Sequence, residues 1–66
     1  MWVDYKGVMA LLEIGRNRSY VAIRKINDEL AEKGYLVNKY KVPLKYLCER
    51  YGIDISEAKE VLAKNS

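Results

Sequence analysis

The chain has 66 residues, half of them apolar and a third charged, with a formal net charge of +3. This size suits a single domain over residues 1–66, and the composition argues against disorder. The chain has no histidine and one cysteine, so it lacks the ligands for a zinc site and cannot form an internal disulfide. Its longest apolar run, Val8 to Leu12, is too short to cross a membrane. We therefore expect a cytoplasmic protein with no metal, no cofactor and no membrane partner.

The first half of the chain predicts two helices. The first begins at Asp4, a suitable N-cap, and ends before Gly15; its apolar face consists of Val8, Leu11 and Leu12. The second is capped by Gly15 or Asn17 and runs to Lys33, with an apolar stripe made of Ala22, Ile23, Ile26 and Leu30. Gly34 follows at the position where a left-handed residue ends a helix.

The second half predicts a hairpin and a third helix. Two β-prone runs, residues 35–37 and 40–42, flank Asn38-Lys39 and indicate a β-hairpin, or a longer loop because lysine resists positive φ. Pro43 cannot extend a paired strand and suits the first position of a helix. That helix is expected to end at Gly52, with a stripe made of Leu44, Leu47, Cys48 and Tyr51.

A short last helix begins at Asp54 or Ser56, where residues 54–57 have the spacing of a capping box. The order helix, turn, helix, hairpin, helix predicts a mainly α winged helix-turn-helix fold with a small β-hairpin and a short C-terminal helix. We assign Cys48 to the core as an inert thiol, and three tyrosines to the core rather than to base stacking: Tyr35, Tyr46 and Tyr51.

Basic residues are concentrated in two segments of the chain. Residues 16–25 contain four basic side chains and no acid, and residues 33–45 contain four lysines and no acid. The acids between them, Asp28, Glu29 and Glu32, are expected to face away from any bound DNA and only to solubilise the far half of the helix. Ordinary solvated charge is the plain alternative, but segregated charge of this kind favours binding of a polyanion.

The two basic segments coincide with the start of the second helix and with the hairpin, which are the two elements that a winged helix-turn-helix presents to DNA. At the helix start, the candidate base and phosphate contacts are Arg16, Asn17, Arg18, Ser19 and Tyr20. Arg24 and Lys25 would reach flanking phosphates. The hairpin tip adds Asn38, Lys39, Tyr40 and Lys41. Tyr20 is equally suited to packing under the first helix.

Residues 8–51 also resemble a family. The pattern is carried by Val8-Met9, Leu12, Tyr20, Ile23-Arg24, Asn27, Glu29-Leu30, Gly34-Tyr35, Val42-Pro43, Tyr46 and Glu49-Arg50-Tyr51. It is similar to the small excisionase-type proteins of phages and conjugative transposons in Gram-positive bacteria, which are related to the MerR-like winged helix. The chain departs from that pattern at Glu13, where the family has a turn glycine, at Gly15, where it has a capping serine, and at Tyr40, where it has a wing glycine.

The resemblance implies a sequence-specific binder of double-stranded DNA that is encoded on a mobile element, binds repeated sites near an attachment site, bends the DNA and biases an integrase toward excision. Self-association on repeated sites would follow from the small size of one module. Two alternatives remain open. One is a small transcriptional repressor of the same fold, and the other is a protein-interaction module that does not bind DNA. An enzyme is not expected, because the chain has no histidine for general base catalysis and no glycine-rich phosphate loop.

Overall fold

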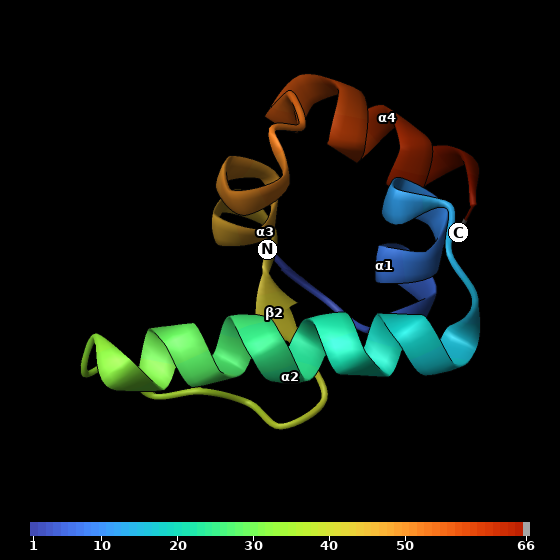
Figure 1. The fold of residues 1–66 in the computed structure, drawn as a ribbon. Coiled ribbons are helices and arrows are strands. Elements are labelled where there is room, and N and C mark those ends of the chain that lie inside the picture. Colours follow the sequence, from blue (N-terminus) through green and yellow to red (C-terminus); the bar gives the residue numbers. More distant parts are fainter. Residues whose placement is uncertain (66) are drawn as a thin grey trace.

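One long helix lies across one side of the molecule and three shorter helices gather on the other (Figure 1). The computed structural model describes residues 1–65. Over this range the chain forms four helices and one two-stranded antiparallel sheet. In chain order the elements are β1 (Trp2–Val3), α1 (Tyr5–Leu12), α2 (Arg16–Glu32), β2 (Val42–Pro43), α3 (Leu44–Tyr51) and α4 (Ile55–Lys64).

Local signals set most helix ends. The Asp4 carboxylate accepts hydrogen bonds from the amides of Lys6 and Gly7 at 3.0 and 3.2 Å, which caps α1 as predicted. Asp54 caps α4 in the same way. Gly34 and Gly52 have φ of 91° and 68°, the left-handed conformation expected after α2 and at the end of α3.

The turn between α1 and α2 is built without a glycine at its first residue. Glu13 adopts left-handed φ and ψ of 55° and 47° as the C-cap of α1, so α1 ends at Leu12 and is shorter than predicted. Gly15, not Asn17, is the N-cap of α2, and it supplies no side-chain hydrogen bond. The two helices therefore follow one another through a turn of three residues.

The predicted hairpin is not formed, and this corrects the sequence interpretation. Val42 pairs instead with Val3, and Pro43 with Trp2, in a short antiparallel sheet between the N-terminus and the start of α3. The physical reason is burial: the side chains of Val42 and Val3 are 0% and 6% exposed. Residues 35–37 are exposed and have no buried face to fix a strand register.

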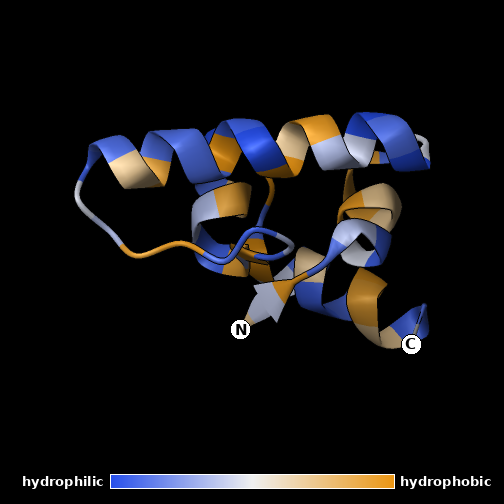
Figure 2. Cartoon of the chain, turned by 90° about the horizontal axis from the view of Figure 1, so that it is seen from below, coloured by the Kyte–Doolittle hydropathy of each residue, from blue (hydrophilic) through white to orange (hydrophobic). Residues whose placement is uncertain are grey.

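Residues 33–41 form what we call the return loop, which runs back beside α2 to β2 (Figures 1 and 2). It contains one isolated β-bridge, between Asn38 and Lys41. At its end, Pro43 has φ of −65° and ψ of 130° and is the N-cap of α3 rather than its first helical residue. The correction therefore concerns the strand pairing of the loop and also its turn, whose central residues are Lys39 and Tyr40 instead of Asn38 and Lys39.

A small apolar core lies between α2 and the other elements. It consists of Val3, Val8, Ala22, Ile23, Ile26, Leu30, Val42, Leu44, Leu47, Cys48 and Ala58. Cys48 is buried, and this burial raises the pKa of its thiol, which fits an unreactive core residue. The tyrosines were only partly predicted: Tyr46 packs against the core, whereas Tyr35 and Tyr51 are exposed.

A polar cluster joins α2 to α3. The carboxylate of Glu29 accepts two hydrogen bonds from Arg50, from Nε at 2.6 Å and from Nη2 at 2.8 Å, and one from the Tyr46 hydroxyl at 2.8 Å. Glu29 was predicted only to solubilise the far half of the helix, so its structural role here is a correction. The hydrogen bonds from Arg50 and Tyr46 lower the pKa of Glu29 to about 2.

This cluster predicts a specific pH dependence of stability. The pKa of Glu29 is lower in the folded state than its ordinary value of 4.5, so its stabilisation is complete above pH 4.5 and is lost as pH falls toward 2. We expect the urea midpoint of the Glu29→Gln variant to fall less between pH 5 and pH 2 than that of the native chain. Equal losses in the two proteins would show that the ion pair is not formed in solution.

Candidate nucleic-acid interface

The outer face of α2 is exposed along its length. Its inner stripe is buried and consists of Ser19, Ala22, Ile23, Ile26, Asn27 and Leu30. Outside it, Asn17, Val21 and Arg24 follow one another at i, i+4 and i+7. Arg18 and Lys25 lie further round the helix, where they line a hollow with Val21 and Tyr51 of α3. Val21 is 62% exposed at the centre of this polar and basic face.

The return loop is held beside α2 by one buried amide. The Nδ2 atom of Asn27 donates a 2.7 Å hydrogen bond to the carbonyl of Asn38. The loop is then closed locally, because the Asn38 carboxamide oxygen accepts from the amide of Tyr40 at 2.9 Å and the Asn38 carbonyl accepts from the amide of Lys41 at 3.3 Å. Asn27 therefore fixes where the loop tip lies along α2.

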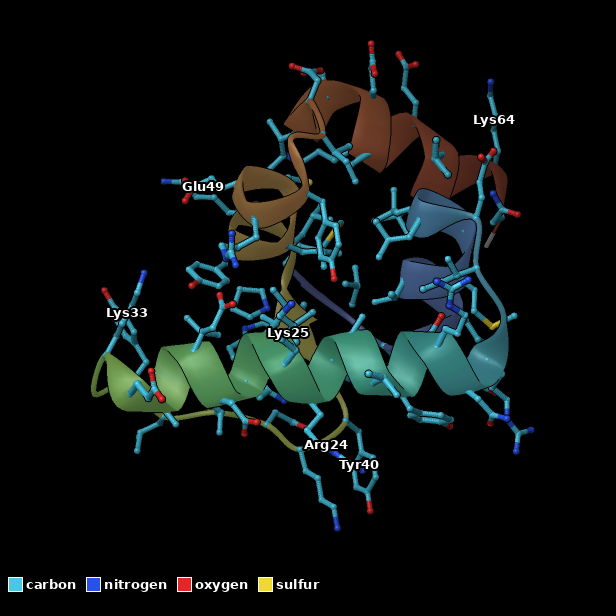
Figure 3. All side chains as sticks on the ribbon, viewed as in Figure 1. Arg24, Lys25, Lys33, Tyr40, Glu49 and Lys64 are labelled. Carbon is cyan, nitrogen blue, oxygen red and sulfur yellow. The ribbon has the colours of Figure 1, made fainter. Side chains whose placement is uncertain are left out.

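A groove separates α2 from the return loop. It has a volume of about 470 Å³, and its lining residues are Tyr20, Arg24, Asn27, Asp28, Val37, Lys39 and Tyr40. Arg24 and Tyr40 project together, away from α1, α3 and α4 (Figure 3). The Nζ atom of Lys39 lies 5.6 Å from the centre of the Tyr40 ring. Two cations from segments distant in sequence, Arg24 and Lys39, thus line one groove, and Asp28 is the acid in its lining.

The predicted contact residues do not all reach this groove. Arg16, Asn17 and Arg18 are exposed at the start of α2. Tyr20 packs against the first helix, which is one of the two roles weighed for it: its ring stacks on Tyr5 of α1 with centroids 5.0 Å apart. It also lines the groove.

Two lysines lie apart from the groove. Lys25 lies with Glu29 and Arg50 on the side of α2 that faces α3. Lys41 lines a different hollow, beside Trp2 and Leu62. Of the four loop-tip residues predicted to contact DNA, Lys39 and Tyr40 line the groove, whereas Asn38 and Lys41 do not.

Ser19 is a clear correction. It was predicted to contact phosphate, but its side chain is completely buried and its hydroxyl donates a 2.9 Å hydrogen bond to the carbonyl of Gly15. The stripe of buried residues on α2 includes position 19, so the hydroxyl helps to hold the first turn of the helix and cannot reach a ligand.

We expect Ser19→Ala to leave duplex affinity within twofold of the native value and to lower the free energy of unfolding by about 1 kcal/mol, because one hydrogen bond is lost. Urea denaturation and a duplex titration on the same preparation measure the two quantities. A tenfold loss of affinity with unchanged stability would restore Ser19 to the interface.

Sequence reasoning missed three residues of this face. Val21 was detectable, because the inward stripe of α2 leaves position 21 on the outside. Asp28 was assigned away from DNA, yet it lies one turn after Arg24 on the groove side. Asn27 carries the only buried side-chain oxygen within residues 1–65 that has no hydrogen-bond partner, its Oδ1. No local signal indicates that Asn27 fixes the loop, since its partner lies eleven residues away.

Replacing Asn27 with alanine is expected to release the return loop while leaving the helices in place. Amide hydrogen exchange of Tyr40 and Lys41 should accelerate severalfold, and the free energy of unfolding should fall by about 1 kcal/mol. Protection of amides in α3 serves as the internal control. Unchanged exchange at Tyr40 would mean that the loop is held by other contacts.

Other kinds of site have little support in this part of the chain. Residues 1–65 contain no group of three or more acidic, histidine or cysteine side chains placed to hold a metal ion. Over the same residues, no helix combines the length and the apolar character needed to cross a bilayer. No family model, curated protein or solved structure is significantly similar to this chain.

Proposed function

We propose that this chain is a non-enzymatic protein that binds double-stranded DNA, with α2 in the major groove and the return loop against the neighbouring backbone. The observation that carries the proposal is the meeting of Arg24 and Lys39 on one face beside the exposed, polar outer side of α2. In this arrangement the loop takes the place of the wing of a winged helix-turn-helix, although its strands are not paired.

The outer face of α2 has the chemistry for reading base edges. An α-helix with its side chains is about 10–12 Å across, which suits a major groove about 12 Å wide. Asn17 has the bidentate geometry that reads adenine, and Arg18 has that for guanine, whereas Arg24 would contact phosphate. Val21, exposed between them, is suited to the methyl group of thymine. Lys39 would contact phosphate without selecting a sequence.

Within this class, the sequence resemblance favours an excisionase that acts with an integrase at repeated sites. The runner-up, a transcriptional repressor, uses the same interface and differs in its partner. Co-purification of an integrase with the tagged chain distinguishes the two, because a repressor has no such partner. Self-association on repeated sites belongs to the same proposal and is measured as cooperative binding to duplexes with two copies of a selected site.

The first experiment is fluorescence anisotropy of a labelled random 25-base-pair duplex at 50 and 200 mM salt. If four cations contact phosphates, affinity should fall about a hundredfold over this interval, since each contact contributes about 0.9 to the logarithmic salt slope. An absence of duplex binding at 50 mM salt would overturn the proposal, and salt-insensitive capture of a protein would favour the interaction module instead.

A further inference from the structure

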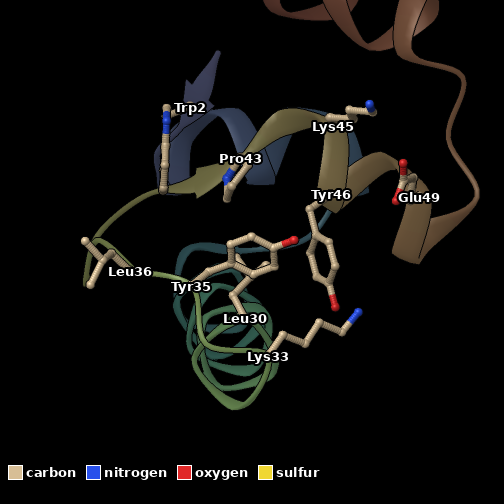
Figure 4. Close-up of a pocket in the computed structure, with 9 residues that line it drawn as sticks. All are labelled: Trp2, Leu30, Lys33, Tyr35, Leu36, Pro43, Lys45, Tyr46 and Glu49. Atoms are coloured by element: carbon tan, nitrogen blue, oxygen red, sulfur yellow. The ribbon is translucent and has the colours of Figure 1, made fainter.

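A second hollow lies at the C-terminal end of α2, on a surface that the proposed DNA contact does not use. Its volume is about 440 Å³ and its lining residues are Trp2, Leu30, Lys33, Tyr35, Leu36, Pro43, Lys45, Tyr46 and Glu49 (Figure 4). We call it the aromatic hollow. It shares no lining residue with the groove beside Arg24.

The aromatic hollow exposes large apolar side chains that are not part of the buried core. Leu36 is 95% exposed, Tyr35 64% and Trp2 48%. They are brought together by different parts of the chain, since Trp2 belongs to β1, Leu30 to α2 and Tyr46 to α3. The loop side is tied to the helix by a 3.0 Å hydrogen bond from the amide of Tyr35 to the carbonyl of Leu30. Contiguous apolar surface of this kind marks interaction sites on small soluble domains.

Lysines surround this apolar surface. The Nζ atom of Lys33 lies 5.0 Å from the centre of the Tyr46 ring, and Lys45 lines the same hollow. Lys41 lies in the adjacent hollow, which also includes Trp2. Neither Lys33 nor Lys45 forms a salt bridge within residues 1–65, and Glu49 is the one acid in the lining of the hollow. The rim is therefore positive around an apolar floor.

We propose that the aromatic hollow binds an acidic segment of a partner protein that inserts a leucine or phenylalanine side chain. Besides its rings, the hollow presents the aliphatic side chains of Leu30, Leu36 and Pro43. These suit a leucine or phenylalanine side chain, whereas a nucleic-acid base would use the rings alone. The lysines complement carboxylates on either side of it. A hollow this small accepts a few side chains, whereas a stable interface between two copies buries roughly 800 Å² on each partner. The proposal does not depend on DNA binding.

Trp2 is the single tryptophan of the chain, so its fluorescence reports directly on the hollow. The probe is the peptide acetyl-Glu-Asp-Leu-Phe-Asp-Glu-amide, which has no tryptophan. We expect it to shift the Trp2 emission saturably at millimolar concentrations. A peptide with lysines in place of the acids, and one with serines in place of Leu-Phe, should give at least tenfold weaker responses. An equal response to either control peptide, or none to the probe, would overturn the proposal.

Variants locate the effect. Leu36→Ser, at an exposed position, and Lys33→Ala with Lys45→Ala should each weaken the peptide response about tenfold, with helical circular dichroism unchanged. Lys59→Ala with Lys64→Ala removes the same charge from α4 and should leave the response unchanged; equal losses in the two lysine pairs would overturn the assignment.

A larger shift with an oligo-dT strand, or a concentration-dependent shift of the protein alone, would also overturn it, in favour of single-stranded nucleic acid or a second copy.

Discussion

Replacing Arg24 and Lys39 together with alanine is expected to weaken binding to any duplex about 60-fold at 0.1 M salt, from about 8-fold for each lost phosphate contact. The logarithmic salt slope should fall by about two, because two fewer counterions are released. Both side chains line the groove between α2 and the return loop, so neither change removes a core contact. Anisotropy titrations at three salt concentrations measure affinity and slope together.

The matched control for this prediction removes the same charge from the opposite side of the molecule. Lys59 and Lys64 lie on α4, across the core from α2 (Figure 1). Alanine at both positions should lower affinity less than threefold and leave the slope nearly unchanged. If the two double variants lost affinity equally, binding would respond to net charge alone, and the face assigned here would be wrong.

Leu47→Ala is expected to lower the free energy of unfolding by about 2–5 kcal/mol, through lost apolar burial and the cavity left behind. Leu47 is completely buried. A chain of this size has a total stability on the order of 3–10 kcal/mol, so a substantial part of the variant should be unfolded at 37 °C. Urea denaturation followed by far-ultraviolet circular dichroism measures the loss.

The same substitution at an exposed leucine tests the packing directly. Leu36 is 95% exposed in the return loop, so Leu36→Ala should change stability by less than about 0.5 kcal/mol. Comparable losses at positions 36 and 47 would mean that the return loop is packed in solution and that the aromatic hollow is filled by the chain itself.

The helices were predictable because the signals for them are local. A carboxylate at Asp4 or Asp54 caps amides two or three residues later, and glycine at positions 34 and 52 takes the left-handed conformation that ends a helix. The spacing of apolar residues on α2 likewise placed Ile23, Ile26 and Leu30 in the core. Each of these interactions joins residues that are close in sequence.

The strand pairing was not predictable in this way. Residues 35–42 have the composition of a hairpin, but the partner of Val42 is Val3, about forty residues earlier in the chain. Pairing with the N-terminus buries both valines, whereas a hairpin would have kept its strands exposed. The prediction for Ser19 was wrong for a related reason. Its polarity suggests a surface role, and only the packing of α2 on the core shows that position 19 is inside.

The sequence by itself determined the composition, the segregation of charge and most helix boundaries, because these are properties of short stretches. They describe a small helical domain with two basic segments and no histidine. The tertiary structure decided which basic residues meet. It placed Arg24 and Lys39 along the same groove and Lys25 on the side of α2 that faces α3. It also placed Lys33 and Lys45 at the separate aromatic hollow. The reason is that a side chain's direction depends on which face of its helix or loop is buried, and that burial is set by contacts between distant segments.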